Sequence, residues 1–160
     1  MKEISEKLVG ILKERNLTLS TAESITGGLV AKTITDVSGS SKVFLGGIVA
    51  YSPFAKINIL RIDKDIIDSH GTVDPVVAEL MARNIKNLFS SYIGISTTGI
   101  AGPDPIEGKP VGLNYVGIAI ENRCFIFENK FEGTRDIIRE KVVHFLINKL
   151  IQILEGGKLL

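Results

Sequence analysis

The chain has 160 residues, a formal net charge of +1 at pH 7 and a single cysteine. This charge balance gives no electrostatic reason to expect a nucleic-acid partner, and one cysteine excludes both an intrachain disulfide framework and a cysteine zinc cluster. Hydrophobic residues make up 44% of the chain but aromatic residues only 6%, so Ile, Leu and Val must fill the core of a domain of ordinary size.

The amino-terminal half is predicted to alternate helices and strands. Apolar residues recur at helical spacing over residues 4–15, and the charges throughout this segment are unlike a signal peptide. A short strand ends near Ala22, a helix follows over residues 26–37, and residues 43–52 form a near-continuous apolar strand, as expected when both faces of a sheet are covered. Residues 53–62 begin with a proline suited to the first turn of a short helix.

The carboxyl-terminal half begins with a strong helix signal. Asp74-Pro75 is typical of an N-cap followed by proline at the first helical position, so a helix is expected over residues 76–88. A strand over residues 92–102 then runs into a loop of turn-forming residues. The remaining segments are predicted to be a hairpin of residues 112–120 and 124–133, a long amphipathic helix over residues 134–154, and a frayed tail from residue 155.

The order of these elements predicts an α/β fold. Helices alternate with strands, and two strands then pair locally before the last helix, which indicates a three-layer α/β/α sandwich around a mostly parallel, mixed sheet. No repeat or linker interrupts the chain, so a single domain over residues 1–160 is expected. No apolar run reaches the ~18 residues of a membrane span, so we expect a cytoplasmic protein without a membrane partner.

Polar side chains follow the predicted strands where each strand ends. Parallel strands bring their carboxyl ends to one edge of an α/β sheet, and such sheets bind ligands at that edge. We therefore expect one site built from three short groups of residues. These groups are Glu23, Ser24 and Thr26 after the first strand, Tyr51, Ser52 and Lys56 after the second, and Ser96, Thr97 and Thr98 at the end of the third.

Lys56 and Ser24 are the candidate catalytic pair. A lysine with its free pKa of ~10.4 is a poor base, but burial among the apolar neighbours in YSPFAKINIL would lower that pKa, and a neutral amine can take the proton of a serine hydroxyl. Tyr51 could relay a proton or orient the lysine. Each residue also has a simpler interpretation, as a solvated lysine, an N-cap serine and a packed tyrosine.

Ser41 is a rival nucleophile. It precedes Tyr51 by ten residues and Lys56 by fifteen, with a predicted strand between them. Because a strand rises ~3.3 Å per residue, Ser41 should lie at the opposite end of this strand from Tyr51. Only a chain reversal at Gly46-Gly47 or a contribution from a second subunit would bring it to Lys56.

The corner at Thr26, Gly27 and Gly28 is a candidate anion site. Glycines let a substrate approach the backbone closely, and the amino end of the helix that follows favours a phosphate. The alternative is that the glycines only allow close packing of helix on sheet. Glu23, just before this corner, could bind a cation or hold a substrate hydroxyl.

The histidines and the cysteine indicate structural roles. His70 is expected in a turn or cap before a helix, and His144 lies inside the last predicted helix, so the two make no metal site. Cys124 lies in an apolar alternation typical of core packing, with a reactive thiol as the alternative.

Six motifs carry a family likeness. In chain order they are TAESITGG, SGSSKVFLGGIVAYSPFAK, SHGTV, STTGIAGPD, GKPVG and EGTRDIIRE. Together they resemble the CinA C-terminal domain family over about residues 5–150, and bacterial members of that family include nicotinamide mononucleotide deamidase. The chain departs from the family pattern at Ile25, where a cysteine is usual, at Leu113-Asn114 and at Thr134.

The resemblance implies a serine–lysine amidohydrolase that needs no metal or cofactor. Its substrate would be a small nucleotide, nicotinamide mononucleotide, and its products nicotinate mononucleotide and ammonia. Catalytic positions of the family fall on Ser24, Lys56, Tyr51 and Ser41. The candidate substrate-binding residues are Glu23, Thr26, Gly27, Gly28, Thr98, Gly99, Arg135 and Arg139, of which either arginine suits a phosphate and the amides near Ile25 or Thr98-Gly99 suit an oxyanion.

Other functions stay open at this point. The chain could be a catalytically inactive module that binds a nucleotide or a protein partner, because likeness of fold does not settle function. A Ser-Tyr-Lys oxidoreductase is disfavoured, since those enzymes place the lysine four residues after the tyrosine and here the gap is five, with Pro53 inside it. A homo-oligomer, most simply a homodimer, is expected from the frequency of such assemblies.

Overall fold

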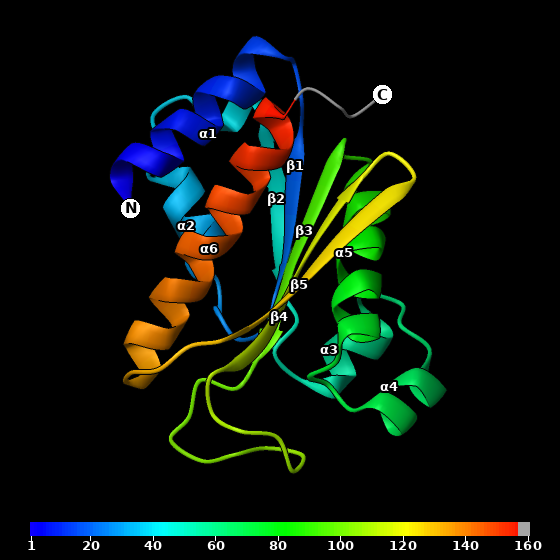
Figure 1. The fold of residues 1–160 in the computed structure, drawn as a ribbon. Coiled ribbons are helices and arrows are strands. Elements are labelled where there is room, and N and C mark those ends of the chain that lie inside the picture. Colours follow the sequence, from blue (N-terminus) through cyan, green and yellow to red (C-terminus); the bar gives the residue numbers. More distant parts are fainter. Residues whose placement is uncertain (157–160) are drawn as a thin grey trace.

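The computed structural model describes residues 1–156, which form a five-stranded sheet with helices on both faces (Figure 1). The strands are β1 (Leu19–Glu23), β2 (Phe44–Val49), β3 (Ile93–Gly99), β4 (Leu113–Ile120) and β5 (Arg123–Lys130). The helices are α1 (Lys2–Glu14), α2 (Leu29–Thr35), α3 (Pro53–Asn58), α4 (Lys64–His70), α5 (Pro75–Phe89) and α6 (Arg135–Glu155), with a 3-10 turn η1 (Ser40–Lys42) before β2.

The sheet is mixed, as the order of elements predicts. Its strands lie in the order β2-β1-β3-β4-β5. β1 pairs in parallel with β2 and β3, whereas β4 runs antiparallel to β3 and β5. The predicted hairpin is therefore β4–β5, and β4 alone runs against the direction of the other strands. The carboxyl ends of β1, β2 and β3 meet at one edge, at the lower end of the molecule in Figure 1.

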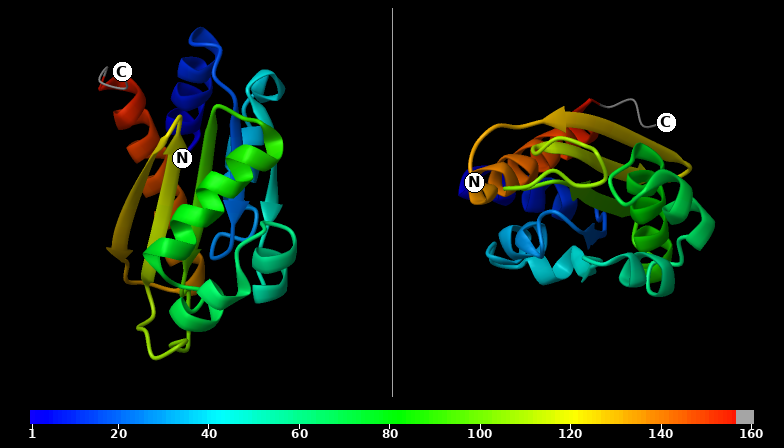
Figure 2. Two further views of the ribbon diagram at one scale, coloured as in Figure 1. Left: turned by 90° about the vertical axis from the view of Figure 1, so that its right-hand side faces the viewer. Right: turned by 90° about the horizontal axis from the view of Figure 1, so that it is seen from below.

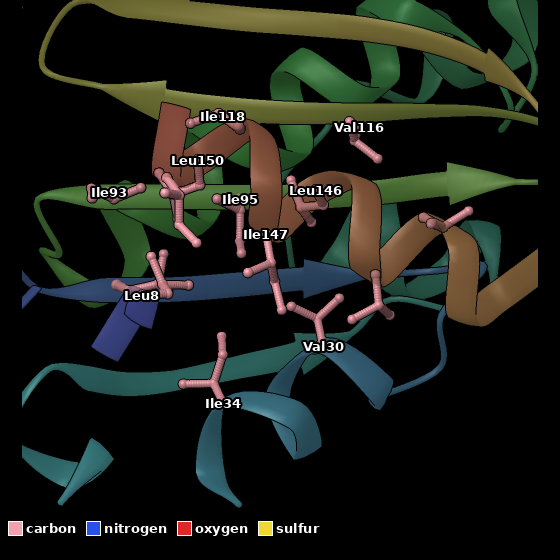
Figure 3. Close-up of a cluster of buried hydrophobic side chains, with 14 of the residues drawn as sticks. Leu8, Val30, Ile34, Ile93, Ile95, Val116, Ile118, Leu146, Ile147 and Leu150 are labelled. Atoms are coloured by element: carbon pink, nitrogen blue, oxygen red, sulfur yellow. The ribbon is translucent and has the colours of Figure 1, made fainter. Parts of the chain in front are cut away.

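Two helical layers enclose the sheet, which confirms the α/β prediction. Helices α1, α2 and α6 cover one face, and α5 covers the other together with the short helices α3 and α4 (Figures 1 and 2). In the core between α6 and the sheet, Leu146 and Leu150 of α6 pack near Ile95 of β3 and Ile118 of β4 (Figure 3). These side chains are at most 1% exposed, so aliphatic residues fill this core as the composition predicts.

The start of α2 differs from the prediction for a backbone reason. The expected helix begins at residue 26, but the structure begins it at Leu29 because Gly27 and Gly28 have φ values of +56° and +99°. This left-handed region favours glycine and is incompatible with a right-handed helix. The two glycines therefore form a turn that precedes the helix.

Two further elements differ from the prediction. Residues Lys64–His70 form α4, where no helix was expected, so His70 ends a helix instead of lying in a loop. Strand β2 was expected to be covered on both faces, but Leu45 and Val49 are 43% and 51% exposed because β2 is an edge strand of the sheet.

The predicted frayed tail falls largely on residues 157–160, outside the described part of the chain, while α6 continues to Glu155. Within residues 1–156, no helix combines the length and the low polarity that a bilayer crossing requires.

Candidate active site

A pocket of about 330 Å³ lies at the carboxyl ends of β1, β2 and β3. Ser24 follows β1, Tyr51 follows β2, and Thr98 lies near the end of β3, and all three line this pocket with Lys56 of α3. The loop from β3 to β4 and the connection from α4 to α5 supply the other walls. The right-hand view of Figure 2 looks onto this end of the molecule. The strand ends that were predicted to share a site do lie together.

Lys56 lies directly against Ser24. Its Nζ donates hydrogen bonds to Ser24 Oγ at 2.8 Å and to the Ala50 carbonyl oxygen at 2.7 Å. Helix α3 places the amine there: the Ser52 hydroxyl accepts from the Ala55 amide at 3.1 Å as an N-cap, Pro53 follows, and Lys56 comes one turn later. With 1% of its surface exposed, Lys56 is not the solvated lysine of the simpler interpretation.

Burial lowers the pKa of Lys56 from its usual 10.5 to about 8, and the negative charge of Glu107 opposes part of that shift. Desolvation disfavours the charged ammonium, so a substantial fraction of the amine is neutral near pH 8. A neutral amine can accept a proton, and Ser24 Oγ is the hydroxyl within its reach. This geometry is that of a nucleophile paired with its general base.

Ser24 sits at a sharp turn after β1. Its backbone amide donates to the Thr97 carbonyl oxygen at 2.9 Å, and its carbonyl accepts from the Gly27 amide at 3.1 Å. The side chain is 9% exposed, so the hydroxyl is shielded but reachable from the pocket. The amide of Ile25, a residue that lines the pocket, has no hydrogen-bond acceptor within residues 1–156, which leaves it available to an oxyanion on this turn.

Glu23 and Thr26 serve α2 and do not line the pocket. The Glu23 carboxylate accepts from the Val30 amide at 2.7 Å and the Ala31 amide at 3.0 Å, and also from the Thr26 hydroxyl at 2.6 Å. The amino end of α2 is therefore already capped by a protein carboxylate. The predicted roles of Glu23 in cation or hydroxyl binding and of this helix end in phosphate binding do not fit the geometry.

Gly27, Gly28 and Arg139 are also placed away from the pocket. Arg139 Nη2 donates to the Thr26 carbonyl oxygen at 2.9 Å, and a Cβ on Gly27 would lie 3.3 Å from that same nitrogen. Arg139 thus fastens α6 onto the turn after β1. The glycines provide the backbone conformation of the turn, which is the simpler of the two interpretations.

Arg135 is the arginine that lines the pocket. Its Nη1 donates to the Gly102 carbonyl oxygen at 2.7 Å and its Nη2 to the Tyr51 hydroxyl oxygen at 2.8 Å. Tyr51 is 60% exposed and is hydrogen-bonded to Arg135 instead of Lys56, so the predicted relay through Tyr51 to the lysine lacks a direct contact. The pair instead presents a guanidinium and a phenol at the rim, which suits an anionic part of a ligand.

Thr98 and Gly99 line the pocket from β3. The Thr98 hydroxyl donates to the Thr72 carbonyl oxygen at 2.6 Å, which ties the strand end to the segment before α5. A Cβ on Gly99 would lie 2.5 Å from Asn114 Cβ and 2.8 Å from the Leu113 carbonyl oxygen. Gly99 therefore permits close pairing of β3 with β4 beside the site.

Ser41 does not reach the site. It is exposed in η1, at the amino end of β2, whereas Tyr51 follows the carboxyl end of the same strand. The strand continues through Gly46 and Gly47 without a reversal. The position of Ser41 within one chain is the one that the strand geometry predicts, and it separates this serine from Lys56.

The other candidate groups take no part in the pocket. His144 is exposed on α6 beside Asn148, and burial raises the pKa of the Cys124 thiol to about 11, which disfavours a reactive thiolate. Within residues 1–156 no three His, Cys, Asp or Glu side chains gather as metal ligands would. A larger hollow of about 640 Å³ runs along the outer side of α6, but neither serine nor cysteine lines it.

Sequence reasoning missed Glu107 and Thr72. The Glu107 carboxylate accepts from the Thr72 amide at 2.9 Å and from the Thr72 hydroxyl at 2.6 Å, and both residues line the pocket. Thr72 lies in the motif SHGTV, and Glu107 lies in the loop after β3, directly before the motif GKPVG. The turn-forming composition of that loop predicts a loop but not which of its side chains points inward.

Known proteins match this chain in both sequence and structure. The family model described as the CinA C-terminal domain matches residues 1–154. A competence-damage inducible protein of Caldanaerobacter subterraneus subsp. tengcongensis is 44% identical over 159 residues, which make up 99% of this chain and 39% of the relative. One from Bacillus subtilis is 39% identical over 143 residues, 89% of this chain and 34% of the relative. The chain thus spans less than half the length of these relatives.

Solved structures agree with the fold. A crystal structure of a CinA superfamily protein from Klebsiella pneumoniae superposes with a TM-score of 0.94 at 26% identity, covering 97% of this chain and 98% of the other. The competence/damage inducible protein CihA from Agrobacterium tumefaciens gives a TM-score of 0.91 at 30% identity, covering 96% and 94%. The names of these proteins state no reaction.

Proposed function

The chain belongs to the CinA C-terminal domain family, and from that premise we propose that it hydrolyses the carboxamide of nicotinamide mononucleotide to nicotinate mononucleotide and ammonia. The choice of substrate rests on the resemblance to the family, and the choice of reaction rests on the side chains that line the pocket. The single observation that carries the proposal is the 2.8 Å contact between a fully buried lysine amine and the Ser24 hydroxyl.

The reaction uses Lys56 as the proton carrier. Neutral Lys56 takes the proton of Ser24 as the serine oxygen attacks the carboxamide carbon, and the amide of Ile25 stabilises the oxyanion that forms. The Lys56 ammonium then gives this proton to the departing nitrogen. Ammonia leaves, and the acyl group remains on Ser24 as an ester. Water attacks the ester, Lys56 takes the water proton and gives it to Ser24, and nicotinate mononucleotide is released.

The rest of the pocket positions the nucleotide. A volume of about 330 Å³ lies at the lower end of the range of small-molecule pockets, which suits a mononucleotide better than a dinucleotide. Arg135, already held by Tyr51 and Gly102, offers its guanidinium to the phosphate. The apolar walls at Ile25, Val73 and Ile106 suit the pyridine ring.

Ammonia release tests the proposal directly. Purified Ser24→Ala and Lys56→Ala proteins should each lose turnover of nicotinamide mononucleotide by about 10³-fold while staying folded by circular dichroism. Ser38→Ala is the matched control, since it removes an exposed serine hydroxyl in the turn after α2, outside the pocket lining, and it should keep wild-type turnover. Near-normal turnover by either pocket variant would refute the serine–lysine pair.

A binding module without chemistry predicts a different result in the same assay. Such a protein would bind nicotinamide mononucleotide in calorimetry and release no ammonia from it or from related pyridine nucleotides. The buried Lys56–Ser24 pair argues against this alternative, because binding alone does not require an amine to be desolvated against a hydroxyl.

A further inference from the structure

Glu107 is the acidic side chain in the lining of the active-site pocket, among the residues that the structure describes. It lies in the loop after β3 and faces the segment that connects α4 to α5. Its carboxylate accepts from the Thr72 amide at 2.9 and 3.0 Å, from the Thr72 hydroxyl at 2.6 Å and, at 3.5 Å, from the Val73 amide. The family chemistry of serine and lysine gives this carboxylate no role.

The negative charge of Glu107 is fixed in position. Partial burial raises the pKa of this carboxyl, but the hydrogen bonds from Thr72 and Val73, with the Lys109 ammonium 3.9 Å away, together outweigh it and hold the pKa below its usual value. Gly71 leaves the space that the carboxylate occupies, since a Cβ there would lie 2.1 Å from Glu107 Oε2. The pocket wall therefore carries a carboxylate that stays ionised at neutral pH and cannot swing away without losing these donors.

This charge acts at the reacting groups. Glu107 raises the pKa of Lys56 against the effect of burial, so its field extends to the amine that contacts Ser24. A ring whose carboxamide lies at Ser24 is also within that field. Arg135 supplies a positive charge at a separate anchor, bonded to Tyr51 and Gly102, so the pocket presents one fixed charge of each sign beside the titrating amine of Lys56.

We propose that the fixed carboxylate of Glu107 makes the site select amides that are attached to a positively charged ring. The inference rests on the proposed deamidase function and assigns to Glu107 the discrimination between a charged and a neutral ring within that substrate class, a zwitterion with a pyridinium ring and a phosphate. The carboxylate attracts the ring cation, while Arg135 attracts the phosphate. The same charge repels the carboxylate that hydrolysis creates, which favours release of the product.

A pair of nucleotides that differ only in ring charge tests this selection. Nicotinamide mononucleotide carries a pyridinium, and the benzamide C-nucleotide has a neutral phenyl ring with the same carboxamide, ribose and phosphate. Every protein titrated in calorimetry carries Ser24→Ala so that no nucleotide is hydrolysed, and the protein with Glu107 intact, which gives the wild-type ratio, should bind the pyridinium nucleotide at least about fivefold more tightly. Glu107→Gln should bring the ratio of the two affinities close to one.

The ratio separates charge from pocket shape. A distorted wall would weaken binding of both nucleotides alike and leave their ratio unchanged. Asp104→Asn is the matched control, because it removes a negative charge from the same loop at an exposed position outside the pocket lining, and it should keep the wild-type ratio. If Glu107→Gln does not fold, the wild-type ratio should still fall when salt is raised, because ions screen the attraction.

Two results would overturn the inference: a wild-type ratio near one, or a Glu107→Gln protein that keeps the wild-type ratio. Ammonia release is measured separately on the corresponding proteins that keep Ser24. If the protein prefers the pyridinium nucleotide but releases no ammonia, the selection by Glu107 stands and the deamidase function is refuted.

Discussion

Lys56 is the residue on which the proposed chemistry depends, because its amine must be neutral to act. The pKa of Lys56 is about 8, so below that pH the neutral fraction of the amine falls tenfold for each pH unit. We therefore expect kcat/KM for nicotinamide mononucleotide to rise about tenfold per pH unit on the acid side and to level off above about pH 8. Ammonia release between pH 6 and pH 10 measures this profile.

Removing the charge of Glu107 should shift this pH profile, which tests whether Lys56 is the titrating group. The Glu107 carboxylate raises the pKa of Lys56, so Glu107→Gln should move the rising limb to lower pH. Ser38→Ala, outside the pocket lining, should leave the limb where it is. A limb that stays in place in Glu107→Gln, or a flat profile in the wild type, would show that Lys56 is not the titrating base.

The two central residues could be predicted from sequence, and the reason is geometric. Ser24 and Lys56 each follow a strand of a parallel pair, and register between parallel neighbours forces their ends together. Glu23 was assigned to the substrate because a carboxylate beside a strand end looks like a site residue. Its actual partners are the amides of Val30 and Ala31, which a prediction with the helix starting at residue 26 could not identify.

At the scale of elements, α2 depends on a single side chain from the preceding strand. Glu23 is 2% exposed and satisfies two amides in the first turn of α2, where no other side chain of the described residues caps them. Glu23→Ala should lower the free energy of unfolding by about 2–3 kcal/mol, because buried amide donors lose a charged acceptor. Urea denaturation measures the loss.

Glu14→Gln provides the comparison for that prediction. Glu14 is an exposed carboxylate at the end of α1, and its replacement should change stability by less than about 0.5 kcal/mol. Equal stabilities of the Glu23 and Glu14 variants would mean that α2 does not need the cap.

Two glycines in different elements should respond to alanine with opposite signs. A Cβ on Gly47 of β2 would lie 2.0 Å from Thr21 Oγ1 and 2.8 Å from the Thr21 carbonyl oxygen, so β1 and β2 would have to separate. Gly47→Ala should therefore destabilise the protein by about 2 kcal/mol. Gly10 of α1 has no atom within 4 Å of that position, so Gly10→Ala should stabilise it by about 0.5–1 kcal/mol through helix propensity. Thermal unfolding of both variants measures the two effects, and a shift of the same sign would contradict the packing.

Elements with a strong periodic pattern were predictable, and elements set by packing were not. The long helix α6 and the β4–β5 hairpin have clear patterns and were placed within a few residues. Helix α4 is seven residues long, too short to show a periodic apolar face. The exposed side of β2 could not be read from its apolar run, because a fully covered strand and the edge strand of a sheet have the same composition.

For the whole molecule, the site carries a cost in stability. A buried lysine contributes no ion pair to the fold in the described chain, and burial opposes its protonation. The same desolvation makes the amine a base at neutral pH. The fold therefore retains a group that weakens it, and in the proposed reaction that group is the general base, a relation seen at many functional sites.

This cost predicts how stability depends on pH. Because the folded pKa of Lys56 is about 8 and its usual value is 10.5, the unfolded chain binds the proton more tightly. Between these two values the folded state has already lost the proton, so rising pH should stabilise the wild type by up to about 3 kcal/mol. Lys56→Met keeps the length of the side chain and lacks the titrating group, so it should not show this gain.

The measurement is the difference in free energy of unfolding between wild type and Lys56→Met, from urea titrations at pH 7.5, 9 and 10.5. Tyr115 and Cys124, whose folded pKa values are raised to about 12 and about 11, make stability fall at high pH. Both proteins carry these groups, so their effect cancels in the difference. The wild type should gain on the variant as the pH rises. A difference that stays constant from pH 7.5 to pH 10.5 would mean that the Lys56 amine is protonated in the folded state, and the proposed general base would then be absent at neutral pH.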